Sequence, residues 1–183
     1  AALKSAFLAL RGRCTPQTGY ITVDCDGQHA IADVRRMAQA LREAPDTLVL
    51  GCRTFGEDTP SRSRMGNRAT SLAVKWLYHI ELEDTQTGLR AFSGAYLQDL
   101  CTLAGDRYEY ELNMLLYAKG HNIPFTVVPI QTLYFDNNSG SHYRTVRDSL
   151  RILGHLLRGA FQYLLSSSLS AIVDVVLYGL LVK

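Results

Sequence analysis

Two aspartates separated by a single residue, Asp24 and Asp26, offer the clearest chemistry in this sequence. They follow a short β-rich run, and the carboxyl ends of strands are where open α/β sheets place their ligands. Two carboxylates at this spacing can bind a hard divalent cation and leave coordination positions for phosphate oxygens, with Gln28 adding a neutral oxygen. The same residues also fit an Asx turn that caps the next helix, so the motif alone leaves both interpretations open.

Arginines follow the next β-rich run and the loop after it. Arg53 comes directly after that run, as the aspartates do after theirs, and Arg62, Arg64 and Arg68 lie in or after the neighbouring loop. Guanidinium groups bind phosphate in a bidentate manner and remain charged, which suits a substrate that carries phosphate. Each of them alone also fits a solvated surface residue, so the phosphate interpretation rests on the position of Arg53.

A third polar segment, DTQTGLR at residues 84–90, joins an acid, three hydrogen-bonding side chains, a flexible glycine and an arginine. Its charged residues are Asp84 and Arg90. Such a segment is either a helix cap with a turn or the floor of an active site, and periodicity does not decide between them.

The elements that must position these residues alternate between helix and strand, which predicts an α/β fold. The strand, helix and strand between residues 20 and 50 predict a βαβ unit with parallel strands and a right-handed crossover. In the helix predicted at residues 65–80, we expect Leu72, Trp76 and Leu77 to face inward. Apolar spacing and breaker residues predict helices at 3–12, 30–44, 65–80 and 108–119, and strands at 20–23, 47–50, 90–93, 125–128 and 131–134, the last two separated by Pro129.

The C-terminal stretch is predicted to divide in two. Residues 149–160 mix leucines with arginines, a pattern typical of an amphipathic helix in a membrane interface. Residues 161–182 are almost wholly apolar and, as a helix, would extend about 33 Å, enough to cross a hydrocarbon core of about 30 Å. Arginines precede this run, so we expect the globular part to be cytoplasmic. The alternative is a buried terminal helix of a soluble domain.

One residue inside the apolar run, Asp174, needs a partner, because a carboxylate in mid-bilayer costs about 2.5–3.5 kcal/mol on insertion. Nearby serines and Gly179 are small enough for membrane helices to pack closely, so we expect further helices and a possible homo-oligomer through them. The chain starts without Met and stops directly after the apolar run, and we expect it to be a fragment cut at both ends.

Composition narrows the class of protein. The 183 residues are 47% hydrophobic and 20% charged, which excludes disordered, collagen-like and disulfide-scaffold chains. A formal net charge of +2 is too small to indicate nucleic acid as a partner. The four cysteines lie far apart in the sequence, so neither a zinc site nor a redox dithiol is indicated.

Taken together, the motifs resemble those of family 2 glycosyltransferases with the GT-A fold. The likeness is greatest to polyprenyl-phosphate sugar transferases, including dolichyl-phosphate mannose synthases and bacterial undecaprenyl-phosphate glucosyltransferases. It covers roughly residues 1–155, and the tail resembles the first helix of a GtrA-like membrane domain. This divides the chain into a partial GT-A domain (1–142), a juxtamembrane amphipathic helix (143–160) and a transmembrane helix (161–183). The segments that carry the likeness are DCDGQH, GCR, SRSRMGNR, DTQTGLRAF, RYEYELNML, VPIQTLYFDNNSGSHY and DSLRIL.

The resemblance implies a role for each motif. Asp24, Asp26 and Gln28 would bind Mg²⁺ or Mn²⁺ and bridge it to the diphosphate of the donor. Arg53 and an arginine of the SRSR segment, taken as Arg64, would hold the acceptor phosphate. The residues implied in addition are Asp84, as a catalytic or acceptor-orienting acid, and a substrate-side group of Arg90, Glu111, Ser139, Ser141 and His142.

The implied reaction is inverting transfer of a sugar from a nucleotide-diphosphate sugar to undecaprenyl or dolichyl phosphate. It would take place at the cytoplasmic face of the cell membrane, in cell-envelope glycan synthesis. The family's nucleotide-reading start would lie upstream of Ala1, so we expect the fragment alone to be inactive. A nucleotidyltransferase would share the aspartate pair but not the membrane helix, and the QxxRW motif of processive synthases is absent. A membrane-anchored transferase with another acceptor and a non-catalytic binding module stay open.

Overall fold

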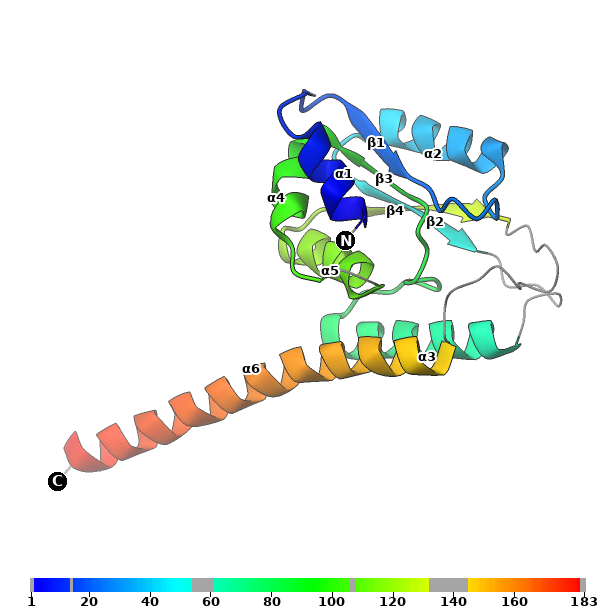
Figure 1. The fold of residues 1–183 in the computed structure, drawn as a ribbon. Helices are drawn as coiled ribbons and strands as arrows, with labels where there is room; N and C mark the ends of the chain where they lie inside the picture. The colour runs from blue at the N-terminus through cyan, green and yellow to red at the C-terminus, as the bar shows by residue number, and fades with distance from the viewer. Residues whose placement is uncertain (1, 14, 54–60, 106–107, 132–144, 182–183) are drawn as a thin grey trace.

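The computed structural model describes residues 2–13, 15–53, 61–105, 108–131 and 145–181. Within this part of the chain, a four-stranded mixed sheet forms the centre of the fold (Figure 1). Its strand order is β1-β3-β2-β4, with β2 and β4 parallel and β3 antiparallel to both of its neighbours. The strands are β1 (Gly19–Thr22), β2 (Leu48–Arg53), β3 (Arg90–Ser93) and β4 (Phe125–Ile130).

The sheet is of the predicted α/β class, but the predicted parallel βαβ unit needs correction. β1 and β2 run in the same direction without pairing, because β3 lies between them and is antiparallel to both. Residues 90–93 come from a part of the chain far beyond the strand-helix-strand segment. A local pattern cannot reveal that a later strand enters between two earlier ones.

Helices cover both faces of the sheet. Figure 1 shows α2 (Ile31–Glu43) on one side, where Met37 and Leu41 pack against Val49. On the other side Leu48 and Leu50 join a larger core, because successive side chains of a strand point to opposite faces. The helices that contribute to this core are α1 (Ala2–Leu10), α3 (Ser61–Tyr78), α4 (Leu97–Thr102) and α5 (Tyr108–Gly120).

The orientation of α3 differs from the prediction. Trp76 is 80% exposed, and Leu72 and Leu77 are also exposed, so the expected inward face is wrong. The helix instead buries Asn67 and Thr70. These two side chains form hydrogen bonds with the segment that follows the helix, and this requirement overrides the apolar pattern.

The middle of the chain also differs from the prediction in detail. β4 continues through Pro129, which lies opposite Cys52 in the parallel pair. Since β2 is the one partner recorded for β4 in the described sheet, a proline without an N–H is tolerated there. The short helix η1 (Gly94–Tyr96) and α4 were not expected from the sequence. Of the second strand predicted after Pro129, residues 132–134 lie outside the described part.

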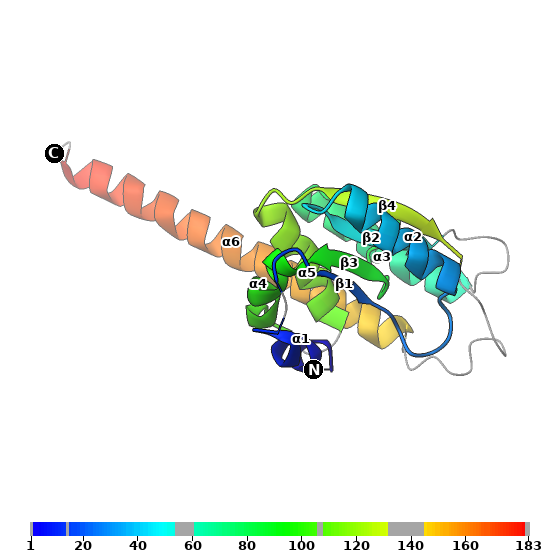
Figure 2. The same ribbon diagram turned by 90° about the horizontal axis from the view of Figure 1, so that it is seen from above.

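The C-terminal stretch forms one helix, α6 (Thr145–Leu181), of 37 residues. The helix passes through residue 160 without a break, so the predicted amphipathic and apolar parts belong to one continuous helix. Figures 1 and 2 show that α6 begins beside α3 and then extends away from the body. Its segment Leu157–Gly179 has a mean hydropathy of 1.5 and is long and apolar enough, by length and composition alone, to cross a membrane.

Candidate active site

Three of the predicted site residues lie at one edge of the sheet. Arg53 is the last residue of β2, Asp24 follows the end of β1, and Arg90 is the first residue of β3. Because β3 runs antiparallel to both neighbours, its start lies beside their ends. The antiparallel insertion that the sequence did not predict is what brings the segment 84–90 to the other two motifs.

Asp84 and Arg53 form a bidentate ion pair at this edge. Arg53 Nε donates to Asp84 Oδ2 at 2.6 Å, and Arg53 Nη2 donates to Oδ1 at 2.9 Å. The backbone N–H groups of Arg53 and Gln86 donate to the same carboxylate at 3.2 and 3.1 Å. Asp84 is completely buried, so these four donors replace its water. The predicted acceptor-binding arginine is thus oriented by the predicted acid.

The segment that carries Asp84 is anchored on α3. Asn67 donates from Nδ2 to the carbonyl of Glu83 at 2.6 Å and accepts the N–H of Thr85 at 3.3 Å. Gln86 donates from Nε2 to Thr70 Oγ1 at 3.0 Å. The sequence analysis did not assign a role to Asn67 or Thr70. The available signal was that both are polar side chains within a predicted helix that also carries apolar residues.

Arg90 fixes the other end of the same segment. It is buried, with Nε donating to the carbonyl of Thr87 at 3.0 Å and Nη2 to that of Thr85 at 3.3 Å. Its Nη1 donates to the carbonyl of Glu111 at the start of α5. Burial lowers the pKa of Arg90, while Glu111 and Asp84 act in the opposite direction. The described bonds of this predicted substrate-side arginine join the loop to α5.

The surroundings of Glu111 perturb the pKa of its carboxyl group. Burial raises its pKa to about 7, with Arg90 and Arg53 opposing the rise and Asp24 and Asp84 adding to it. A carboxyl with a pKa near neutrality can exchange a proton at physiological pH, and such groups are concentrated in functional sites. The five charged residues therefore influence one another as a single electrostatic cluster, the sheet-edge cluster of Asp24, Arg53, Asp84, Arg90 and Glu111.

The aspartate pair lies at the open side of this cluster. The Asp24 side chain is 54% exposed, and Asp26 is also exposed. Asp26 Oδ1 accepts the backbone N–H of Gln28 at 3.0 Å, which is an Asx turn. Ala30 at the N-cap of α2 has no side-chain cap bond, so the turn does not cap the helix.

A divalent cation would fit the aspartate pair only in part. Two exposed carboxylates and the amide of Gln28 are oxygen donors of the kind that Mg²⁺ and Mn²⁺ prefer. Across the described residues, however, three or more His, Cys, Asp or Glu side chains do not gather into a metal-binding group. The donors present therefore suit a cation that completes its coordination with oxygens of a bound substrate.

Several predicted site residues cannot be placed against this cluster. Arg64 lies in α3, and its side chain is outside the described part, as are Ser139, Ser141 and His142 altogether. His29, the last residue of the DCDGQH segment, was given no role in the sequence analysis. In the structure its Nε2 lies 3.5 Å from Asp24 Oδ2.

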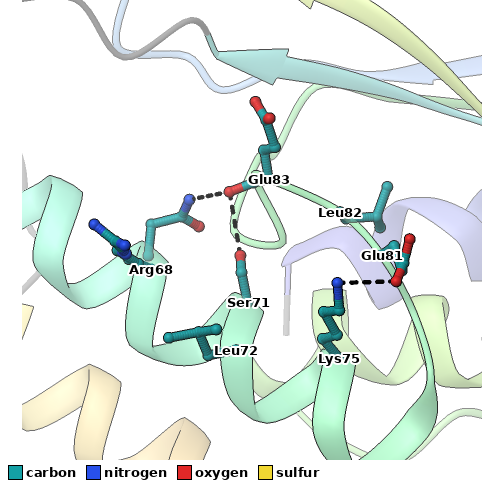
Figure 3. Close-up of a pocket in the computed structure, with 8 residues that line it drawn as sticks. Arg68, Ser71, Leu72, Lys75, Glu81, Leu82 and Glu83 are labelled. Carbon is teal, nitrogen blue, oxygen red and sulfur yellow. Dashed lines mark hydrogen bonds and ion pairs between the residues drawn. The ribbon is translucent and has the colours of Figure 1, made fainter.

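A cleft of about 500 Å³ lies between α3 and the segment 81–83 (Figure 3). Leu72 and Leu82 contribute apolar surface, while Lys75 Nζ pairs with Glu81 Oε1 at 2.9 Å across it. Figure 3 shows Ser71 pointing to the backbone of Glu83, which it contacts at 3.2 Å. The cleft borders the sheet-edge cluster only through the residue before Asp84.

The comparisons with known proteins support a glycosyltransferase family for this chain. It is 33% identical over 119 residues to a UDP-N-acetylglucosamine–dolichyl-phosphate N-acetylglucosaminyltransferase of Methanococcus voltae, a match that covers 62% of this chain and 47% of the relative. It is 30% identical over 146 residues to glycosyltransferase AglJ of Haloferax volcanii, covering 76% and 46%. An uncharacterized protein, MJ1222 of Methanocaldococcus jannaschii, is 31% identical over 119 residues, covering 62% and 49%.

The chain thus spans about half the length of the curated relatives that it matches. No family model and no solved structure matches it. The α/β fold and the sheet-edge cluster are consistent with these glycosyltransferase relatives.

Proposed function

We propose that this chain is part of an enzyme that transfers a sugar, with inversion, from a nucleotide-diphosphate sugar to a polyprenyl phosphate at the cytoplasmic face of a membrane. The observation that carries this proposal is the 33% identity to a relative named as a dolichyl-phosphate N-acetylglucosaminyltransferase. The convergence of Asp24, Arg53 and Asp84 at one sheet edge supports it, because transfer between two phosphate-bearing substrates needs both cationic and anionic groups in one place.

On the donor side, Asp24 and Asp26 are the residues that would hold Mg²⁺ or Mn²⁺, with Gln28 as a neutral ligand. The cation would neutralise charge on the leaving diphosphate. Both carboxylates are exposed, so a donor diphosphate can reach them from solvent. Their position after β1 sets them beside the segment that carries Asp84.

On the acceptor side, the reaction needs little help from a base. A phosphate monoester has a second pKa near 6, so it is mostly dianionic at pH 7 and its oxygen can attack the anomeric carbon directly. One oxygen–carbon bond forms, the bond from that carbon to the diphosphate breaks, and a single displacement inverts the configuration. We therefore assign Asp84 the task of orienting Arg53 toward the acceptor phosphate, with Arg64 as a second phosphate ligand.

The outer part of α6 fits a membrane anchor. Its described side chains from Phe161 to Gly179 are exposed, and apolar types dominate. Ser166 Oγ donates to the carbonyls of Gln162 and Tyr163 at 3.1 and 3.0 Å, so its hydroxyl is satisfied within the helix and tolerates a lipid environment. Lipid would cover the apolar surface that the rest of the fold leaves exposed.

The direct test is a donor screen on membranes that contain the natural protein, supplied with polyprenyl phosphate and Mg²⁺ or Mn²⁺. UDP- and GDP-linked sugars, labelled in the sugar, are expected to yield a chloroform-soluble sugar phosphate. Transfer to soluble phosphates without lipid product would favour another acceptor class. A complete lack of transfer, with nucleotide-sugar binding retained, would favour a non-catalytic binding module.

A further inference from the structure

Asp24 and Gly88 lie opposite each other, just beyond the paired ends of β1 and β3. β1 and β3 pair antiparallel with Thr22 opposite Arg90, and continuing this register past both strands sets Asp24 opposite Gly88. Thr22 Oγ1 donates to the carbonyl of Gly88 at 2.7 Å, so the two segments stay in contact beyond the end of β3. Opposed residues of an antiparallel pair direct their side chains to the same face. A side chain at position 88 would therefore compete with Asp24 for space.

The space above Gly88 is filled by the Asp24 carboxylate. A Cβ atom added to Gly88 would lie 2.3 Å from Asp24 Oδ2 and 2.6 Å from Oδ1, closer than real Cβ contacts allow. Gly88 does not belong to the glycines with positive φ, so its backbone conformation does not require glycine. The sequence suggested a flexible glycine, but the structure indicates that its lack of a side chain matters.

A second contact comes from His29. Its Nε2 lies 3.5 Å from Asp24 Oδ2, and its side chain is only 7% exposed, compared with 54% for Asp24. A ring that is enclosed in this way has little freedom to turn. Asp24 is thus held between the bare backbone of Gly88 and a fixed imidazole, while the rest of its carboxylate stays open to solvent.

We infer that Gly88 and His29 are positioning residues that fix the orientation of the Asp24 carboxylate for cation binding. The inference rests on the cation role proposed above for Asp24. It joins two motifs that the sequence presents separately, because Gly88 lies in the segment that Arg90 and Asn67 anchor. That segment carries Asp84, so the acceptor-side acid and the donor-side carboxylate are held by one loop.

The first readout needs no cation. With ¹³C-labelled histidine in the purified natural protein, Gly88→Ala is expected to shift the ring resonances of His29, because the added methyl displaces the Asp24 carboxylate beside it. In an Asp24→Ala background the same change is expected to cause no further shift, since the atoms that the methyl would strike are gone. Gly120→Ala is the matched control, because a Cβ there meets nothing within 4 Å.

The second readout is the affinity for Mn²⁺ alone, measured by electron paramagnetic resonance. Gly88→Ala is expected to weaken binding by about tenfold, the lower end of what loss of a supporting residue costs a metal site. The Tm is expected to stay within about 4 °C of the wild type, since only the end of a short side chain has to move. Gly120→Ala is expected to leave the affinity unchanged.

The outcomes separate this inference from the proposed function. An unchanged His29 spectrum and unchanged Mn²⁺ affinity in Gly88→Ala would overturn the positioning role. A His29 shift with no Mn²⁺ binding by the wild type, either alone or with a nucleoside diphosphate present, would uphold the contact with Asp24 and overturn the cation assignment. If Gly88→Ala does not fold, His29→Asn removes the other contact, and equal Mn²⁺ affinity in that variant would equally count against the inference.

Discussion

The sheet-edge cluster and the outer half of α6 differ in what they bury: the first buries charged side chains, and the second exposes apolar ones. At the sheet edge, Asp84 and Arg90 are buried and the protein itself supplies their partners, as ion pairs and backbone hydrogen bonds. In the outer half of α6, apolar side chains such as Leu169 and Val175 are exposed, and Asp174 is a carboxylate within the apolar segment. The first region supplies its own polar partners, whereas the apolar side chains of the second are left uncovered by the described part of the chain.

Because of this difference, substitutions in the sheet-edge cluster are tested by the unfolding free energy, and substitutions in α6 by the share of protein in the membrane fraction. Removing a partner from the sheet-edge cluster leaves a buried charge unsatisfied, so the cost falls on folding. A charge added to the outer half of α6 meets no packed neighbours in the described structure, so under the proposed membrane anchoring its cost falls on insertion into lipid. The predictions below separate these two kinds of cost.

The largest effect is expected from Asp84→Ala. The change leaves the Arg53 guanidinium facing a buried space without its carboxylate, and breaking a buried pair in this way costs about 3–5 kcal/mol of unfolding free energy. Urea denaturation in mild detergent measures the loss. Glu81→Ala, which breaks the exposed pair with Lys75, is the control and is expected to change little. Equal stability of the two variants would contradict the account of the cluster.

A similar free energy is expected in the other region for Leu169→Arg, but with a different readout. An arginine near the middle of the apolar segment costs about 2.5–3.5 kcal/mol on insertion scales, so the share of protein in the membrane fraction is expected to fall. Leu8→Arg places the same charge at an exposed leucine of α1 and controls for added charge alone. Flotation on a density gradient measures both, and equal loss from the two variants would argue against anchoring by α6.

A smaller effect concerns the pH dependence of the sheet-edge cluster. The folded pKa of Glu111 is about 7 and its ordinary value is 4.5, so the folded state binds the proton more tightly. Its contribution to stability is therefore complete below about pH 4.5 and is lost as the pH rises through 7. Without added cation, we expect the unfolding free energy to fall by about 2 kcal/mol between about pH 5 and pH 7.5. Glu111→Gln is expected to flatten this slope, and an unchanged slope would refute the assignment.

The same contrast explains what the sequence could reveal. Local periodicity located most elements, with α2 at Ile31–Glu43 and α5 at Tyr108–Gly120 close to the predicted ranges. The apolar run of α6 was equally plain, because composition alone marks it. Strand order was not accessible, since the entry of β3 between β1 and β2 depends on pairing between distant segments.

The site was predictable as a set of residue types but not as an arrangement. The sequence pointed to Arg53 and Asp84 separately, and only the fold shows that they form one bidentate pair. From the sequence, Gly88 was interpreted as a flexible residue. Its close approach to Asp24 depends on the register between β1 and β3, which the sequence does not show. No role was predicted for Asn67, because a polar residue within a helix is usually solvated. In the structure its side chain instead forms hydrogen bonds with the backbone of Glu83 and Thr85.

The central claim is that the aspartate pair supports cation-dependent sugar transfer while α6 holds the protein at the membrane. Asp26→Asn in the natural protein tests it most directly, with transfer to polyprenyl phosphate and membrane flotation measured on the same preparation. Asp46→Asn is the matched control, because Asp46 is an exposed carboxylate before the opposite end of β2 from Arg53. The account predicts that Asp26→Asn loses cation-dependent transfer and keeps membrane association. Unchanged cation-dependent transfer in that variant would contradict it.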